Sequence, residues 1–255
     1  MTTIAPTAGR RPAWFLIASA EARMLARNKV ALLTATATPL ALSGFVLAVS
    51  TRGGSGTSAA VLAGTHLVML LGFTAYAAAT MTLTSRREQL YLKRLRSSPA
   101  STTEIVAGLT APLVGLLLAQ VAVAFVATAV ATGEAPARPA LLVLAAGTGC
   151  LTCIGLAFFT AAFTRTSEAA QFTTFPGFLA LVGGAIWVHM TPAGEVAAPM
   201  LAVPGAAVAQ LNRYGWDAGL PAGPDAVLPP LIAAVAVAAL AAYLATRTFR
   251  WQPRT

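Results

Sequence analysis

The sequence predicts an all-α integral membrane protein with six transmembrane helices. The chain has 255 residues, of which 57% are hydrophobic and only 10% charged, whereas a soluble domain is usually about 25% charged. The hydrophobic residues also form uninterrupted blocks of the ~20 residues that a helix needs to cross a bilayer. So few charged residues cannot cover a globular surface of this size, which disfavours a soluble enzyme.

Six blocks without a charged residue define the predicted spans, which are residues 30–49, 59–84, 105–131, 140–163, 172–190 and 227–246. Each block is apolar on all sides of a helix, as expected of helices in lipid. Ser101-Thr102-Thr103-Glu104 has the pattern of a capping box at the start of the third span. The chain therefore divides into an N-terminal segment, one six-span domain and a tail, at residues 1–29, 30–246 and 247–255.

The basic residues predict the orientation. Of the 17 Lys and Arg residues, 14 lie in the N-terminal segment, the loops after the second and fourth spans, and the tail. The other three are Arg52, Arg138 and Arg213. Because basic residues concentrate on the cytoplasmic side of a membrane protein, we expect both termini in the cytoplasm. The net charge of +9 then reflects orientation in the cell membrane and does not indicate a nucleic-acid partner.

The segment between the last two predicted spans, residues 191–226, differs from the other outer loops. It contains five prolines but also an apolar run at 197–203. Helical pieces that dip into the membrane and return would fit, because irregular backbone at that depth needs protein or a cavity to satisfy it. The alternative is an ordinary extracellular loop lying in the interface.

The spans contain nothing that could use an ion gradient. An Asp, Glu, Lys or Arg inside a membrane helix usually marks a proton or ion site, and the six blocks have none. The chain also lacks the Gly-x-x-x-x-Gly-Lys-Ser/Thr phosphate-binding motif. A catalytic role for Ser55 is disfavoured, because it lies in a glycine-rich outer loop with no oriented base. Energy for uphill transport would have to come from another chain.

A few polar residues lie inside the predicted spans. Cys150 and Cys153 have the spacing of a redox or metal pair, but two small buried side chains are the preferred interpretation. His66 and His189 fall near the outer face, where interfacial packing is favoured over a ligand or pH-sensing role. Gln120 is expected to make an interhelical hydrogen bond worth about 1 kcal/mol, with substrate contact as the alternative.

Residues 86–96 predict a short amphipathic helix. Glu88, Tyr91, Leu92 and Leu95 fall on one side of a helical projection, and the remainder is mostly basic, with Arg86, Arg87, Lys93, Arg94 and Arg96. Such a helix could lie on anionic headgroups or insert into a cleft on a soluble partner.

Residues 13–28 predict a second amphipathic helix, lying in the interface before the first span. Its apolar stripe includes Trp14, Ile17 and Leu25 and is interrupted by Glu21. That carboxylate needs a partner, which could be Arg23, Arg27 or a basic residue of 86–96.

Three segments in this order resemble the membrane subunits of ABC-2 type transporters. Residues 22–29, followed by an apolar run with a proline, resemble the family's basic amphipathic helix and first span. Residues 87–101 resemble its hallmark loop, with Arg87-Glu88, a Leu-Arg pair and a turn centred on Pro99. Residues 202–208 resemble its proline-centred outer segment. One departure is Gln89-Leu90, where the family often has Gly-Thr, which blurs the helix start.

The resemblance implies that two permease copies pair around a pathway and that separate ATPase subunits bind the cytoplasmic face. ATP and Mg²⁺ would then bind to the partner and no cofactor to this chain. The 86–96 helix would couple to the ATPase, through Arg86, Arg87, Glu88, Tyr91, Leu92, Arg94, Leu95, Arg96 and Pro99. The 13–28 helix would be its interface companion, through Trp14, Ile17, Glu21 and Leu25, and the outer gate would include Pro199 and Pro204.

The expected function is export of a hydrophobic or amphiphilic compound, such as a drug, an antibiotic or a lipid-like molecule. Residues that could line the pathway are Phe172, Phe175, Phe178 and Gln120, although lipid contact or packing explains each aromatic side chain equally well. The rival class is a membrane protein without a transport cycle, such as an assembly or immunity factor. An ion-coupled carrier is the third alternative and is opposed by the uncharged spans.

Overall fold

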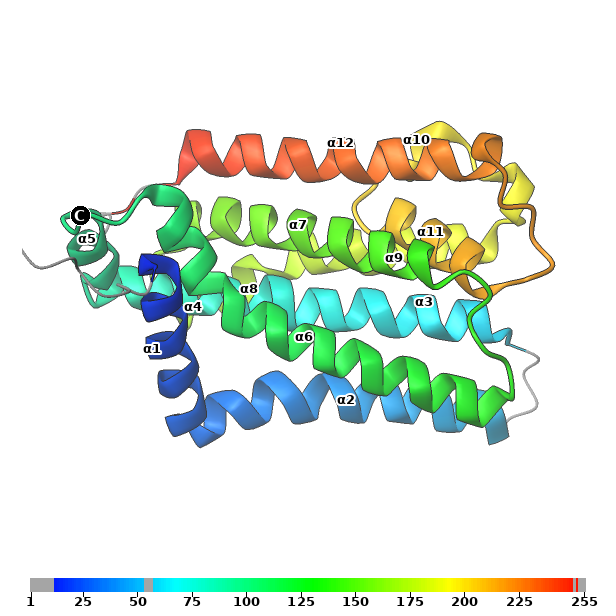
Figure 1. The fold of residues 1–255 in the computed structure, drawn as a ribbon, viewed down its shortest axis with the longest axis horizontal. Helices are drawn as coiled ribbons and strands as arrows, with labels where there is room; N and C mark the ends of the chain where they lie inside the picture. The colour runs from blue at the N-terminus through cyan, green and yellow to red at the C-terminus, as the bar shows by residue number, and fades with distance from the viewer. Residues whose placement is uncertain (1–11, 53–56, 250, 252–255) are drawn as a thin grey trace, which may run out of the picture.

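A computed structural model describes residues 12–52, 57–249 and 251, which contain helices and no strand. Figure 1 shows the long helices running side by side as one bundle. In chain order these are α2 (Lys29–Arg52), α3 (Ala59–Leu70) continued by η1 (Leu71–Ala77) and α4 (Ala78–Glu88), α6 (Thr102–Thr132), α7 (Pro139–Phe163), α8 (Ala170–Thr173) with α9 (Phe175–Met190), and α12 (Pro224–Thr248). The all-helical prediction is confirmed for the described residues.

Within the described part of the chain, five helical stretches are long and apolar enough to cross a membrane. They are Ala59–Glu88, Thr102–Thr132, Pro139–Phe163, Ala170–Met190 and Pro224–Thr248, and they coincide with the second to sixth predicted spans. The first predicted span lies in α2, whose 24 residues correspond to about 36 Å at 1.5 Å per residue. That α2 is a sixth crossing stays a prediction. The glycine-rich loop with Ser55, like Arg10, Arg11, Arg250 and Arg254, lies outside the described residues.

The predicted start of the third span is confirmed in detail. The Ser101 hydroxyl accepts a hydrogen bond from the Glu104 N–H at 3.2 Å, and the Ser101 N–H donates to Glu104 Oε2 at 2.9 Å. This is the reciprocal capping box that satisfies two N–H groups left free at a helix start. It fixes the first residue of α6, which starts at Thr102 after the turn that follows residue 96.

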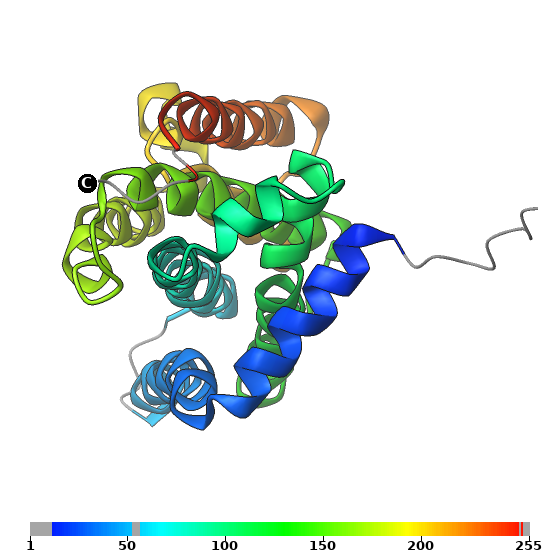
Figure 2. The ribbon, with the colours of Figure 1, turned by 90° about the vertical axis from the view of Figure 1, so that its left-hand side faces the viewer.

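Two short helices lie at one end of the bundle, α1 (Ala13–Arg27) and α5 (Tyr91–Arg96). Figure 2 views the bundle from this end and shows α1 crossing its face obliquely. Where α1 packs on α6, a Cβ on Gly108 would stand 2.6 Å from Ile17 Cβ, so the close crossing requires a glycine. The chain returns to the same end, since Trp251 lies 5.3 Å under the guanidinium of Arg96.

The opposite end of the bundle holds the segment between α9 and α12. It forms η2 (Ala193–Glu195), α10 (Ala198–Leu201) and α11 (Ala206–Trp216). Every residue of α11 except Arg213 is buried, because the helix packs among α3, α7, α9 and α12. The expected helical pieces are present, and their depth in a membrane stays a prediction.

Two arginines tie this segment to the long helices. Arg138 donates to the backbone carbonyls of Tyr214, Asp217 and Leu220 at 2.8, 2.9 and 3.0 Å. Arg213 donates to the carbonyls of Val188 and Thr191, at 3.2 and 2.8 Å, at the end of α9. These guanidinium groups satisfy carbonyls that a helix end and a loop leave without partners.

Candidate functional site at the end of α4

Three consecutive charged residues end α4 and contact three different parts of the molecule. We call Arg86, Arg87 and Glu88 the α4 junction. Successive side chains on a helix point about 100° apart, so one helical turn can reach several neighbours. The partners of these three residues lie on α1, at the end of α7, and in the loop between α7 and α8.

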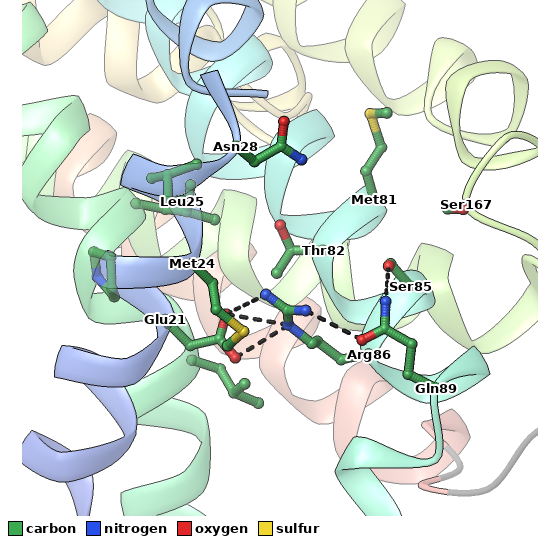
Figure 3. Close-up of a pocket in the computed structure, with 13 residues that line it drawn as sticks. Glu21, Met24, Leu25, Asn28, Met81, Thr82, Ser85, Arg86, Gln89 and Ser167 are labelled. Carbon is green, nitrogen blue, oxygen red and sulfur yellow. Dashed lines mark hydrogen bonds and ion pairs between the residues drawn. The ribbon is translucent and has the colours of Figure 1, made fainter. Parts of the chain in front are cut away.

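The first link of the α4 junction joins α4 to α1. Arg86 Nη2 lies 2.9 Å from Glu21 Oε2, and Arg86 Nε lies 3.1 and 3.2 Å from the two carboxylate oxygens. Only 4% of Glu21 is exposed, and this burial raises the pKa of Glu21 while the hydrogen bonds and charge of Arg86 oppose the rise. Of the partners considered for Glu21, which were Arg23, Arg27 and a basic residue of 86–96, the structure shows the last, Arg86, and Figure 3 shows the pair.

The second link joins α4 to the end of α7. Arg87 is 2% exposed, and its guanidinium donates to the Ala161 carbonyl at 2.7 Å and to the Thr164 carbonyl. The last carbonyls of a helix lack intrahelical partners and carry a partial negative charge, so a cation there is stabilising. The prediction that placed Arg87 on the solvated face of an amphipathic helix is wrong, because the Arg87 side chain is buried against the end of α7.

The third link is weaker and lies at the surface. Glu88 is exposed, and its Oε2 accepts a hydrogen bond from the Ser167 N–H at 3.3 Å. Ser167 belongs to the loop between α7 and α8. The α4 junction therefore fixes both the last turn of α7 and the loop that follows it.

The predicted helix over 86–96 is not continuous. Its first three residues complete α4, and the chain then turns through Leu90, whose φ of 57° lies in the left-handed region. The separate helix α5 covers only Tyr91–Arg96. A side chain such as leucine rarely adopts this backbone conformation, which is why the amphipathic pattern alone suggested one helix.

The apolar face of α5 packs on the bundle. Leu92 is fully buried, and Tyr91 and Leu95 are half-buried against the same core. The apolar face of this helix was expected to contact either lipid headgroups or a cleft on a soluble partner. Both expectations are wrong for α5, because its apolar face contacts the bundle itself. The residues that α5 exposes are Lys93, Arg94 and Arg96, followed by Ser97 and Pro99 in the next turn.

A pocket of about 310 Å³ lies beside the α4 junction, between α1, α4 and α6. Figure 3 shows Glu21, Arg86 and Gln89 linked by hydrogen bonds along one side of it. Met24 and Met81 also line the pocket, which extends to Leu109, Leu113 and Ser167. This pocket could not be predicted from the sequence, because the residues that line it come from segments far apart in the chain.

Gln120 participates in an interhelical hydrogen-bond network. Pro39 has no N–H to donate to the Ala35 carbonyl four residues earlier in α2. Gln120 Nε2 donates to that carbonyl at 2.8 Å, and the Thr74 hydroxyl donates to Gln120 Oε1 at 2.7 Å. Thr74 belongs to η1, a π-helical turn within the span. This network supports the packing interpretation of Gln120, and a role in a substrate pathway stays a prediction.

The other predicted pathway and gate residues occupy varied positions. Phe172 and Phe175 are 80% and 60% exposed on α8 and α9, whereas the Phe178 ring packs edge-on against Phe73 with centroids 4.8 Å apart. Pro199 is exposed in α10, and Pro204 is half-buried before α11. The structure does not gather these five side chains into one site.

The two cysteines and two histidines of the predicted spans pack in or against the bundle. Cys150 and Cys153 are buried free thiols. His66 is 1% exposed, with its Nδ1 3.1 Å from the Thr128 hydroxyl. His189 lies against Gly64, where an added Cβ would stand 2.7 Å from its Nε2. These positions agree with packing roles.

A family model described as ABC-2 type transporter matches residues 12–188. The chain belongs to the ABC-2 type transporter family. The match covers 177 of the 255 residues and runs from the start of α1 almost to the end of α9, so it includes the α4 junction and both of its helical partners. An ABC-2 permease is the membrane component of a transporter and is not itself catalytic. No curated protein matches the chain.

Proposed function

We propose that this permease is the membrane-spanning subunit of an ATP-driven exporter. It moves a hydrophobic or amphiphilic compound, such as a drug, an antibiotic or a lipid-like molecule, out of the cell. ATP and Mg²⁺ bind to a separate ATPase subunit, and two permease copies, identical or paralogous, surround the pathway. Membership of the ABC-2 family supports the transport role and an ATPase partner in general.

The α4 junction is the observation that carries the proposed mechanism. α5 follows α4 after a two-residue turn, and α4 contacts α1 through Arg86 and α7 through Arg87. Because the Arg87 link is buried and the Arg86 link largely so, a force passed from α5 to α4 through this short turn would reach two other helices. Rigid-body movement of packed elements is an established way to convert a local change into a global one.

The surface that α5 presents suggests how the ATPase binds. Its apolar residues face the bundle, and Lys93, Arg94 and Arg96 are exposed. We therefore assign the contact to these cations, which favour an acidic surface on the partner. Pro99, exposed in the turn after α5, belongs to the same surface. The distribution of basic residues supports a cytoplasmic location for both termini and for this surface.

The first test is co-purification with an ATPase that carries the phosphate-binding motif, followed by a screen for compounds that raise its turnover. Lys93→Glu and Arg94→Glu should each reduce compound-stimulated ATPase activity at least tenfold. Arg247→Glu is the matched control, because Arg247 is also exposed and lies at the end of α12. Full stimulation in both α5 variants would show that the ATPase contacts another surface.

The second test separates the exporter from its rivals. Vesicles that contain this chain and the ATPase should accumulate cargo only when ATP is supplied. Transport without nucleotide and without a second polypeptide would contradict the proposal and favour a carrier. Absence of any ATPase partner and any transport would favour an assembly or immunity factor.

A further inference from the structure

The pocket beside the α4 junction is lined by both polar and apolar side chains. The polar ones include Glu21, Arg86 and Gln89, and Gln89 Nε2 donates to the Ser85 hydroxyl at 3.1 Å. The apolar ones include Met24, Met81, Leu109 and Leu113. At about 310 Å³ the pocket falls within the size range of small-molecule sites. Two methionines in the wall allow it to adapt to ligands of different shape.

The charges in the wall select against an ionic ligand. Glu21 is almost fully buried, and its carboxylate is matched by the guanidinium of Arg86. An anionic head that bound Arg86 would leave Glu21 unpaired, and a cationic head that bound Glu21 would leave Arg86 unpaired. An unpaired charge in a buried site is strongly unfavourable. Hydroxyl or amide groups can instead bond to Gln89 and Ser85 without breaking the ion pair.

The position of the pocket indicates how a ligand reaches it. α1 lies across the end of the bundle and exposes Trp14, Phe15 and Leu16. Aromatic side chains on such a helix lie at the level of the lipid headgroups. We therefore expect the pocket beneath α1 to lie at the depth of the headgroup region, within reach of molecules dissolved in that leaflet.

We propose that this pocket binds an uncharged amphiphile with a hydrogen-bonding head, and that exported cargo loads through it from the inner leaflet. The loading role rests on the proposed exporter function, whereas the binding site does not. Two sources share this ligand chemistry, the exported compound and a neutral membrane lipid, and the test below distinguishes them.

The binding test uses the full chain in phosphatidylcholine nanodiscs and three photoreactive dodecyl diazirine probes. Their heads are glucoside, sulfate and trimethylammonium, which are neutral, anionic and cationic. We expect the neutral probe to label peptides of α1, α4 and α6 at least fivefold more than either charged probe. Equal labelling by all three probes would overturn the proposal.

Pocket variants make the result specific to this site. Met81→Trp fills the pocket and should reduce labelling by the neutral probe at least fivefold. Thr82 also lines the pocket, and Thr82→Trp is the second variant if the first does not fold. Leu118→Trp is the matched control, because Leu118 is 55% exposed and lies about 180° around α6 from Leu109. Unchanged labelling in a folded pocket variant would overturn the proposal.

A charge variant tests the selectivity argument. Glu21→Gln keeps the shape of the wall but leaves Arg86 without its counter-charge. The sulfate probe should then label the pocket at least fivefold more than it labels the wild-type protein, whereas loss of the fold would reduce labelling by all three probes. No gain for the sulfate probe would show that the ion pair does not set selectivity.

Competition distinguishes the two sources of ligand. Dodecyl glucoside without the diazirine should displace the neutral probe, and dioleoylglycerol at 5 mol% should not. Displacement by dioleoylglycerol would identify a resident lipid site and overturn the loading role. If labelling follows the expected pattern but ATP-driven transport is absent, the exporter function fails and the binding site stands.

Discussion

Replacing Glu21 and Arg86 by methionine, singly and together, tests whether the ion pair holds α1 against α4. Methionine is unbranched, forms helices well and has a similar length, so the substitutions remove charge with little change in shape. Each single variant leaves one charge without its partner, and the double variant removes both. We therefore expect each single variant to be less stable than the double variant.

The size of the effect follows from the burial of the two side chains. Breaking a fully buried ion pair costs about 3–5 kcal/mol. The side chain of Glu21 is 5% exposed, but that of Arg86 is 17% exposed, so water compensates part of the loss and we expect roughly 2–3 kcal/mol. In a chain of this size 1 kcal/mol lowers Tm by about 2–4 °C. Each single variant should therefore unfold roughly 4–12 °C below the wild-type protein.

The loss in Arg86→Met should depend on pH. Burial raises the pKa of Glu21, and without Arg86 nothing on the α4 side opposes that rise. The folded state then binds a proton more tightly than the unfolded state, whose carboxyl titrates near 4.5. Stability relative to the wild type should consequently be lowest above the raised pKa and should recover as the pH falls toward 4.5.

The assay is thermal unfolding in detergent, with the circular dichroism of the helices as the signal, at several pH values between 4.5 and 8. It compares the wild-type protein, the two single variants and the double variant under the same conditions. A double variant within about 2 °C of the wild type would agree with the known tolerance of apolar replacements for buried pairs. Additive losses in the double variant, or a deficit of Arg86→Met that does not change with pH, would refute the reasoning.

Substitutions at three further sites, centred on Arg87, Gln120 and Leu90, test other parts of the structure. Arg87→Met should cost about 1–3 kcal/mol by leaving buried carbonyls at the end of α7 without donors, and Arg87→Lys should recover part of the loss in a thermal unfolding assay. Gln120→Leu should cost about 1 kcal/mol, and adding Pro39→Ala should reduce that loss, because residue 39 then donates its own N–H to the Ala35 carbonyl. Leu90→Gly should gain roughly 0.5–1 kcal/mol of unfolding free energy, whereas Leu90→Val should lose stability, since φ at this position is 57°.

The helices of the bundle could be predicted because their signal is local. Uninterrupted apolar runs define spans directly. The predicted spans 105–131 and 140–163, for example, differ by at most three residues at either end from the helices Thr102–Thr132 and Pro139–Phe163. The capping box at Ser101 was equally visible, because both of its partners lie within one turn. The π-helical turn η1 has no such signal, since its residues form an ordinary apolar run.

The site could be predicted only in part because its contacts are not local. A helical projection assigns every arginine to the polar face, so it cannot distinguish Arg86 or Arg94 from Arg87, which is buried by the end of α7 some 74 residues later. The break at Leu90 was also hidden, because leucine gives no indication of a left-handed backbone. Glu21 was recognised as needing a partner because an isolated carboxylate in an apolar stripe is physically costly.

The placement of polar groups explains why the end of the bundle, and not its middle, is the better candidate for energy input. In the middle, the Thr74 hydroxyl and the Gln120 amide bond to each other and to the carbonyl that Pro39 leaves free. Such bonds hold helices together at fixed positions. The predicted spans also contain no charged residue to which an ion moving down its gradient could bind. At the α4 junction, by contrast, charged side chains join four segments within one helical turn. A rotation of α5 that is passed on to α4 through the Gln89-Leu90 turn would have to move α1 and α7 or break the Arg86–Glu21 ion pair and the hydrogen bonds of Arg87. This makes the α4 junction the place where an external force would be most effective.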